Sequence, residues 1–175
     1  SIRTNYTRVA IDKVPGISPL CRICKQFNET IDHVLSGCPK LSQAFYKQRH
    51  DKVCAAVHWA LCRQYGFECG KAFYDHRAEK VLENEKVKIL CDFHIQSDLV
   101  VEACRPDIVV VDKSTREALV IDIAVPKDHL VITREQDKLL KYQGLASEMK
   151  KNWRLNKVKV VPVVIGMLGA VSPNI

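Results

Sequence analysis

Two neighbouring apolar runs constrain the fold of this chain more than any other part of its sequence. The runs are "DIVVVD" at 107–112 and "ALVIDIAV" at 118–125, and the short segment "KSTRE" joins them. Both are rich in β-branched residues and apolar at consecutive positions, as strands are when their sheet is covered on both faces. We therefore expect two neighbouring strands inside a covered sheet.

Each of these runs contains an aspartate, Asp107 in the first and Asp122 in the second. Burying an unpaired carboxylate is costly. If the strands pair, both side chains come together at one edge of the sheet, where they repel each other unless a divalent cation lies between them. Mg²⁺ favours carboxylate oxygens and keeps bound waters, one of which can become a nucleophile. The alternative is that both aspartates are strand caps or surface charges.

The pattern after residue 77 predicts the other elements of the same domain. We expect a helix over "RAEKVLENEK" (77–86), which is rich in helix formers, and a strand over the alternating run "ILCDFHIQ" (89–96). Helical spacing covers 133–153, and "KVKVVPVVIG" (157–166) predicts a final strand. The order α-β-β-β-α-β predicts an α+β or α/β fold with a mixed β-sheet flanked by helices.

A cluster of metal-binding residue types precedes this domain. "CRICKQFNETIDHVLSGC" gives the spacing Cys21-x2-Cys24-x8-His33-x4-Cys38. Two thiolates around a tight turn, closed by a His and a third Cys, form a tetrahedral site for Zn²⁺, and binding of about 10 kcal/mol can fold a segment with no core of its own. The alternative is a hairpin with chance cysteines. His50 could replace a ligand, but it lies in a helical pattern, and we expect it to point to solvent.

The sequence divides into four expected segments. They are a basic arm or linker over 1–20, a CCHC zinc knuckle over 21–38, a helical spacer over 39–76 and the sheet domain over 77–175. Apolar residues at three- and four-residue steps, and at one longer step, predict a helix over 39–63 in the spacer. These apolar residues are Leu41, Phe45, Val53, Val57 and Leu61.

Charge and composition favour a soluble intracellular protein, or a piece of one, with a polyanionic partner. Lys and Arg outnumber Asp and Glu by 27 to 20. No secretory signal is recognisable at the start, and the apolar run "VVPVVIGMLGAV" is too short to span a membrane and contains Pro162. The cysteines outside the knuckle are expected to be buried reduced thiols. They are Cys54, Cys62, Cys69, Cys91 and Cys104.

The two aspartates resemble the motif of the PD-(D/E)xK nucleases, in which "PD" is followed by a second acid after a loop. That family's lysine lies two residues beyond the second acid, where this sequence has Ala124. Lys138 or Lys141, three apart on one face of the next helix and beside Tyr142, could supply it instead. A lysine near the attacked phosphate stabilises the charge that develops in the transition state. The alternative is that both lysines decorate an ordinary amphipathic helix.

Further candidates are an acid and several basic side chains. Glu85, in the helix expected before the first strand, is a candidate third acidic ligand, although "LENEK" is also ordinary helix surface. Arg105 precedes "PD" and is expected to contact DNA or to pair with an acid. Basic residues around the knuckle could contact phosphates, or could simply form a solvated face. They are Lys25, Lys40, Lys47 and Arg49.

The ordered set of motifs resembles the C-terminal part of site-specific non-LTR retrotransposon proteins of the Dong type, which carry a restriction-like endonuclease. The motifs are the CCHC knuckle, the helical spacer, "RPDIVVVD", "VIDIAVP" and "DKLLKY". The resemblance implies a restriction-endonuclease-like fold in a nuclear protein with a reverse transcriptase upstream. It also implies an endonuclease that nicks a target DNA duplex, so that the free 3′ end primes reverse transcription, with the element RNA as a further partner.

Carried onto this sequence, the resemblance assigns roles to individual residues. It makes Asp107 and Asp122 ligands of a catalytic Mg²⁺ or Mn²⁺ and Lys138 the displaced catalytic lysine, with Lys141 and Tyr142 nearby. The four Cys and His residues of the knuckle become ligands of a structural Zn²⁺. Two alternatives stay open: a nucleic-acid-binding module with an inactive nuclease fold, and a scaffold that docks the upstream polymerase through its helices.

Overall fold

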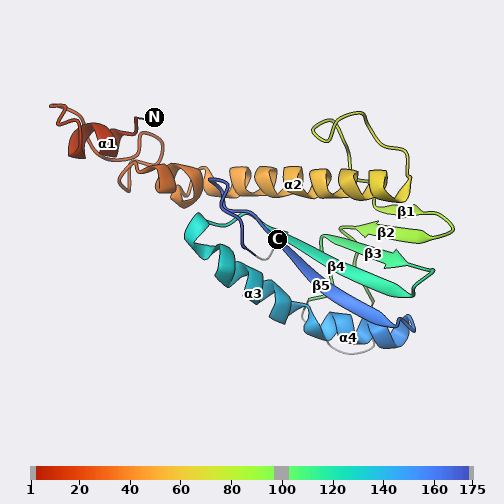
Figure 1. The fold of residues 1–175 in the computed structure, drawn as a ribbon. Helices are drawn as coiled ribbons and strands as arrows, with labels where there is room; N and C mark the ends of the chain where they lie inside the picture. Colours follow the sequence, from red (N-terminus) through yellow and green to blue (C-terminus); the bar gives the residue numbers. More distant parts are fainter. Residues whose placement is uncertain (1–2, 97–102, 174–175) are drawn as a thin grey trace.

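A computed structural model describes residues 3–96 and 103–173, so the outermost residues of the expected arm and sheet domain lie outside the described part. The protein is built around one five-stranded sheet with strand order β1-β2-β3-β4-β5. Helix α2 runs along one side of this sheet and helices α3 and α4 along the other, while α1 lies beyond one end of α2 (Figure 1).

The sheet is mixed, as the sequence predicted. Its strands are β1 (Val81–Glu83), β2 (Val87–Cys91), β3 (Ile108–Asp112), β4 (Glu117–Ala124) and β5 (Lys157–Val164). The first four pair antiparallel in succession, and β5 pairs parallel with β4. The parallel pair follows from the crossover through α3 and α4, because a parallel neighbour needs a long connection.

The two central strands are apolar at consecutive positions because both faces of the sheet are covered. On one face Val109 and Val120 pack with Leu145 and Met149 of α4. On the other face the buried residues of β3 and β4 pack against Val53, Val57 and Leu61 of α2. The strands expected from "DIVVVD" and "ALVIDIAV" are confirmed.

The long helix of the spacer is also confirmed. Helix α2 spans Ser42–Tyr65 and ends at Gly66, which adopts a left-handed φ of 73° and donates its backbone N–H to the carbonyl of Cys62. A left-handed residue at this position favours glycine. One residue of the predicted apolar face, Phe45, is exposed.

The expected helix over 77–86 is wrong. Residues 81–83 form β1, and Asn84 shapes the turn into β2 by accepting hydrogen bonds at Oδ1 from the backbone N–H groups of Lys86 and Val87 at 2.9 and 2.7 Å. Helix propensity amounts to a few tenths of a kcal/mol per residue, which strand pairing with β2 readily overrides.

Two further boundaries differ from the sequence expectation. The strand expected over 89–96 ends at Cys91, because Asp92 adopts a positive φ of 49° that takes the chain out of the sheet, and Phe93 is exposed. The helix expected over 133–153 is divided at Tyr142 into α3 (Val131–Lys141) and α4 (Gln143–Asn152).

The short elements are α1 (Asn5–Ala10), the π-turn His33–Gly37 and the 3-10 turn Asp128–Leu130. None of the eight cysteines forms a disulfide, and of the five expected to be buried reduced thiols, Cys54, Cys69 and Cys104 are only half-buried. Among residues 3–96 and 103–173, no helix has the length and apolar character needed to cross a membrane.

Candidate active site and metal centre

The antiparallel pairing of β3 with β4 brings Asp107 and Asp122 to the same edge of the sheet. The last pair in the register is Ile108 with Ile121, and one further step along it sets Asp107 opposite Asp122. The backbone N–H of Ile123 donates to Oδ2 of Asp107 at 2.6 Å. Both aspartates line one cleft with a volume of about 910 Å³.

Asp122 is almost fully buried, and two side chains from the end of α3 donate hydrogen bonds to its carboxylate. The ammonium of Lys138 forms an ion pair with Oδ2, and the phenol of Tyr142 donates to Oδ1 at 2.6 Å. The ammonium of Lys138 therefore compensates the buried charge of Asp122, whereas the sequence predicted that a metal ion would do so. Both partners come from the end of α3, where the break at Tyr142 turns its ring inward.

Asp107 is less buried and has a partner that the sequence argument missed. His50 of α2 lies with Nε2 3.2 Å from Oδ2 of Asp107. Burial tends to raise the pKa of Asp107, but the hydrogen bonds from His50 and from the N–H of Ile123 outweigh it and leave the pKa below its ordinary value. The hydrogen bond to Asp107 in turn raises the pKa of His50.

The expectation that His50 points to solvent is therefore wrong. The helical pattern located His50 on α2, but only the packing of α2 on the sheet brings it to Asp107, 57 positions away along the chain. No local spacing in the sequence signals such a contact.

Lys141 and Arg105 lie around the same cleft. The ammonium of Lys141 is 3.0 Å from the phenolic oxygen of Tyr142 and 4.6 Å from the centre of its ring. Burial raises the pKa of Tyr142 far above its usual range, and the nearby carboxylate of Asp122 adds to the effect. Arg105 pairs with an acid, which was one of the two roles expected for it. Its guanidinium lies 2.7 Å from the carboxylate of Asp92, and both side chains are exposed.

Glu85 does not join this site. It lies exposed in the turn between β1 and β2. The register pairs Val87 with Asp112, so this turn is at the opposite end of the sheet from Asp107. Its assignment as a third acidic ligand is wrong, because it depended on a helix over 77–86 that does not form. In the described part of the chain, neither Asp107 nor Asp122 belongs to a group of three or more metal-ligand side chains.

The Cys and His residues of the knuckle form a candidate zinc-binding cluster, as predicted. All four side chains are buried, and one ligand atom from each lies within 4.8 Å of the others. The Sγ atom of Cys24 is 3.3 Å from Nε2 of His33. Three sulfurs and one imidazole nitrogen are the donors of closed structural zinc sites. The cluster consists of Cys21, Cys24, His33 and Cys38.

A short hairpin presents the first two cysteines. The N–H of Cys21 donates to the carbonyl of Phe27, and the N–H of Lys25 donates to the carbonyl of Cys21. Lys25 itself adopts a left-handed φ of 57° that closes the turn. His33 follows in the π-turn, so the Cys-x2-Cys spacing and the distant His converge without a hydrophobic core of any size.

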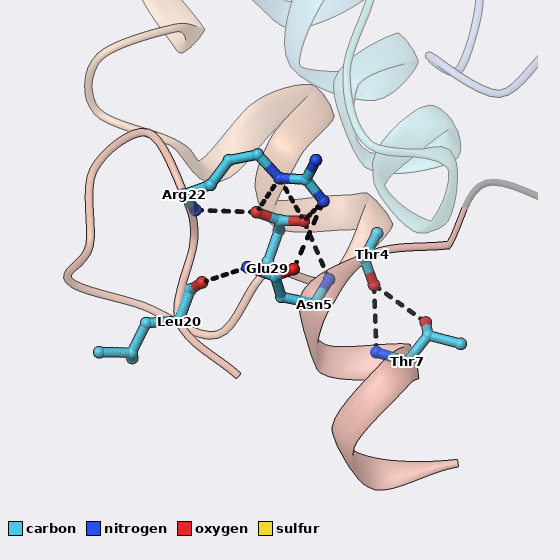
Figure 2. A network of polar contacts seen from close by, with 6 residues as sticks. All are labelled: Thr4, Asn5, Thr7, Leu20, Arg22 and Glu29. Carbon is cyan, nitrogen blue, oxygen red and sulfur yellow. Dashed lines mark hydrogen bonds and ion pairs between the residues drawn. The ribbon is translucent and has the colours of Figure 1, made fainter. Parts of the chain in front are cut away.

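The residues of the expected arm are attached to this knuckle through one buried carboxylate (Figure 2). Glu29 accepts from the guanidinium of Arg22 at 2.7 Å, from the N–H of Arg22 at 2.8 Å and from the N–H of Asn5 at 2.9 Å. The Arg22 hydrogen bond lowers the pKa of Glu29 to about 2. The first turn of α1, which Thr4 caps, is thereby fixed to the hairpin.

The basic residues proposed for nucleic-acid contact lie in different surroundings. Lys25 and Lys40 are exposed, and Lys47 lines the cleft beside His50. Arg49 is half-buried and donates to the carbonyl of Leu35 at 3.0 Å, so it connects the knuckle to α2.

No protein-family model and no curated protein matches this chain. The assignment of a function therefore depends on the residues of the cleft and of the knuckle.

Proposed function

We propose that this chain is a metal-dependent DNA endonuclease domain of the restriction-like PD-(D/E)xK type, which nicks a target duplex to prime reverse transcription of a non-LTR retrotransposon. The observation that carries the proposal is the meeting of Asp107, Asp122 and Lys138 in one cleft at the edge of a mixed sheet. Two acids and a lysine are the minimum set for hydrolysis of a phosphodiester by this class.

The donor chemistry of the acid pair fits a divalent cation. Among the described residues, donors contact only Oδ2 of Asp107, which leaves Oδ1 for a ligand. The ammonium at Asp122 supports the view that this position attracts positive charge. Asp107 and Asp122 would hold Mg²⁺ or Mn²⁺, which when bound lowers the pKa of a water ligand and neutralises phosphate charge.

The side chains around the acids have separate tasks in this proposal. Lys138 stabilises the charge that develops on the attacked phosphate and helps to orient the water. Tyr142 holds the carboxylate of Asp122 in place, and His50 does the same for Asp107. Hydrolysis leaves a 3′-hydroxyl on the nicked strand, which is the group that a reverse transcriptase extends.

The charge of the cleft suits a nucleic acid backbone. Basic side chains on its walls come from four separate parts of the chain, and the chain as a whole has a net charge of +7. Such contacts supply sequence-independent affinity for phosphates. These basic residues are Lys47, Arg77, Arg105, Lys138 and Lys141.

A plasmid-nicking assay tests the proposal. The wild-type chain should convert supercoiled plasmid to open circles with Mg²⁺ or Mn²⁺, and Asp107→Asn and Asp122→Asn should abolish the conversion. Asp112→Asn is the matched control, because this aspartate ends the same strand but its Oδ1 serves only the adjacent turn through the N–H groups of Ser114 and Thr115. An inactive wild type, or active Asp107 and Asp122 variants, would overturn the proposal.

One observation favours the second function, a nucleic-acid-binding module with an inactive nuclease fold. Lys138 and Tyr142 contact both oxygens of Asp122, so a metal must displace one of them. A gel-shift assay alongside the nicking assay separates the two functions. Duplex binding that Asp122→Asn leaves unchanged, with no nicking by the wild type at any metal concentration, would favour the binding module.

A further inference from the structure

A second cluster of metal-ligand side chains lies apart from the knuckle. His58 and Cys62 are one turn apart on α2, and His76 comes from the connection over 66–80 between α2 and β1. One ligand atom from each lies within 4.8 Å of the other two. An i, i+4 pair on one helix face closed by a distant histidine is a common arrangement for a metal site.

The distances within this cluster are close to those of a zinc site. The Sγ atom of Cys62 is 3.4 Å from Nδ1 of His58, almost the 3.3 Å separation of Cys24 and His33 in the knuckle. Tetrahedral zinc with ordinary bond lengths sets sulfur and nitrogen about 3.6 Å apart and two nitrogens about 3.3 Å apart. Nδ1 of His58 is 2.7 Å from Nε2 of His76, so the two rings need to separate only slightly to admit the ion.

Burial also favours an ion over a purely polar contact. The side chains of His58 and Cys62 are completely buried. Nδ1 of His58 faces both Sγ of Cys62 and Nε2 of His76, so a single ion can bind all three atoms.

The connection that carries His76 has no regular structure. Residues 66–80 contain neither helix nor strand, and Phe73 and Tyr74 within them are exposed. It also contacts α2 through a hydrogen bond from the indole N–H of Trp59 to the carbonyl of Gly70 at 2.7 Å and through the edge-to-face rings of Trp59 and Phe73. Connections of this length without regular structure are uncommon in compact domains, and a metal is one way to order them.

We propose that His58, Cys62 and His76 bind a second Zn²⁺, which holds the connection 66–80 against α2. Water completes the tetrahedron, since three protein ligands are present. His76 and Arg77 line the cleft that contains Asp107, so the ion fixes one wall of that cleft. The proposal does not depend on nuclease activity.

Metal content of the purified full chain tests the proposal first. The wild type should contain two zinc ions per chain by mass spectrometry of the metals. His76→Gln, at a partly exposed position, and Cys62→Ser should each contain one, as should the knuckle variant Cys21→Ser. Cys54→Ser is the matched control, since it lies on the same helix outside the cluster, and should keep two. A wild type with one zinc, lost completely in Cys21→Ser, would overturn the proposal.

Limited proteolysis of the Cys21→Ser variant gives a second test that needs no folded knuckle. With zinc present, trypsin should cut slowly after Lys71 and Arg77, and a chelator should accelerate cutting about tenfold or more. Added zinc should restore protection. With His76→Gln in the same background, the chelator should make no difference. Equal cutting of the parent with and without zinc would show that no metal holds this connection.

Discussion

Tyr142 donates a hydrogen bond from its phenolic oxygen to Oδ1 of Asp122 across 2.6 Å, and both side chains are buried. The ring lies at the break between α3 and α4, so this bond fixes the end of α3 against β4. Lys138, from the same end of α3, contacts the other carboxylate oxygen. The orientation of Asp122 in the sheet therefore depends on the helix that follows it.

Removing the hydroxyl of Tyr142 should destabilise the fold. Tyr142→Phe leaves the buried carboxylate of Asp122 without one of its two donors, and an unsatisfied buried group costs about 1–3 kcal/mol. Urea denaturation at neutral pH measures the change in the free energy of unfolding. Tyr74→Phe is the control, because Tyr74 is 76% exposed, and it should change stability by less than about 0.5 kcal/mol. Equal stability of wild type and Tyr142→Phe would mean that the bond contributes nothing.

The two lysines of α3 should differ in their effect on plasmid nicking. Lys138→Met removes the ammonium that contacts Asp122 and should slow nicking about 100-fold or more, a much larger effect than on DNA affinity. Lys141→Met should have a much smaller effect, since within 3–96 and 103–173 Lys141 contacts the phenol of Tyr142 and no acid. Nicking rates under single-turnover conditions, with a gel-shift assay for binding, make the comparison. A larger loss in Lys141→Met would reverse the assignment of the catalytic lysine.

The central part of the sheet could be predicted from sequence because its signal is local. β3 and β4 are continuous apolar runs joined by a short turn, and burial on both faces leaves such runs no other favourable structure. The knuckle could be predicted for a related reason: its four ligands fall within residues 21–38, and their spacing alone specifies the chemistry.

The remaining features depend on contacts between distant segments. The helix expected over 77–86 does not form, because residues 81–83 pair with β2 as a strand. Glu85 was assigned to the acidic site because of that helix, and it lies at the other end of the sheet. The approach of His50 to Asp107 and the convergence of His58 with His76 both need α2 to be packed in place. Nothing in their local sequence distinguishes these histidines from ordinary helix or loop residues.

The pair of His50 and Asp107 predicts a pH-dependent contribution to stability. The hydrogen bond to Asp107 raises the pKa of His50 above 6.5, and the lowered pKa of Asp107 keeps the carboxylate ionised throughout this range. The contribution of a group with a raised pKa is complete below its unfolded value and is lost as the pH rises through its folded value. His50→Gln should therefore destabilise the protein more at about pH 6 than at about pH 8.5.

Urea denaturation at the two pH values, in buffer without added divalent cations, measures this difference. His129→Gln is the control, because His129 is exposed in the turn before α3, and should have almost no effect at either pH. An NMR titration of the His50 ring should also show its pKa falling in Asp107→Asn. A destabilisation by His50→Gln that is the same at both pH values would contradict the prediction.

Loss of the knuckle zinc should unfold the N-terminal part of the chain and leave the sheet folded. Among the described residues, the hydrophobic cluster of the knuckle consists of its own cysteines with Leu41, so metal binding supplies most of its stability. The two clusters on the sheet faces contain no residue before Val53. In Cys21→Ser, amide hydrogens of α1 and of the hairpin around Glu29 should exchange within minutes, while those of β3 and β4 stay protected. Cys54→Ser should leave both groups protected, and loss of protection throughout the sheet in Cys21→Ser would show instead that the zinc supports the whole fold.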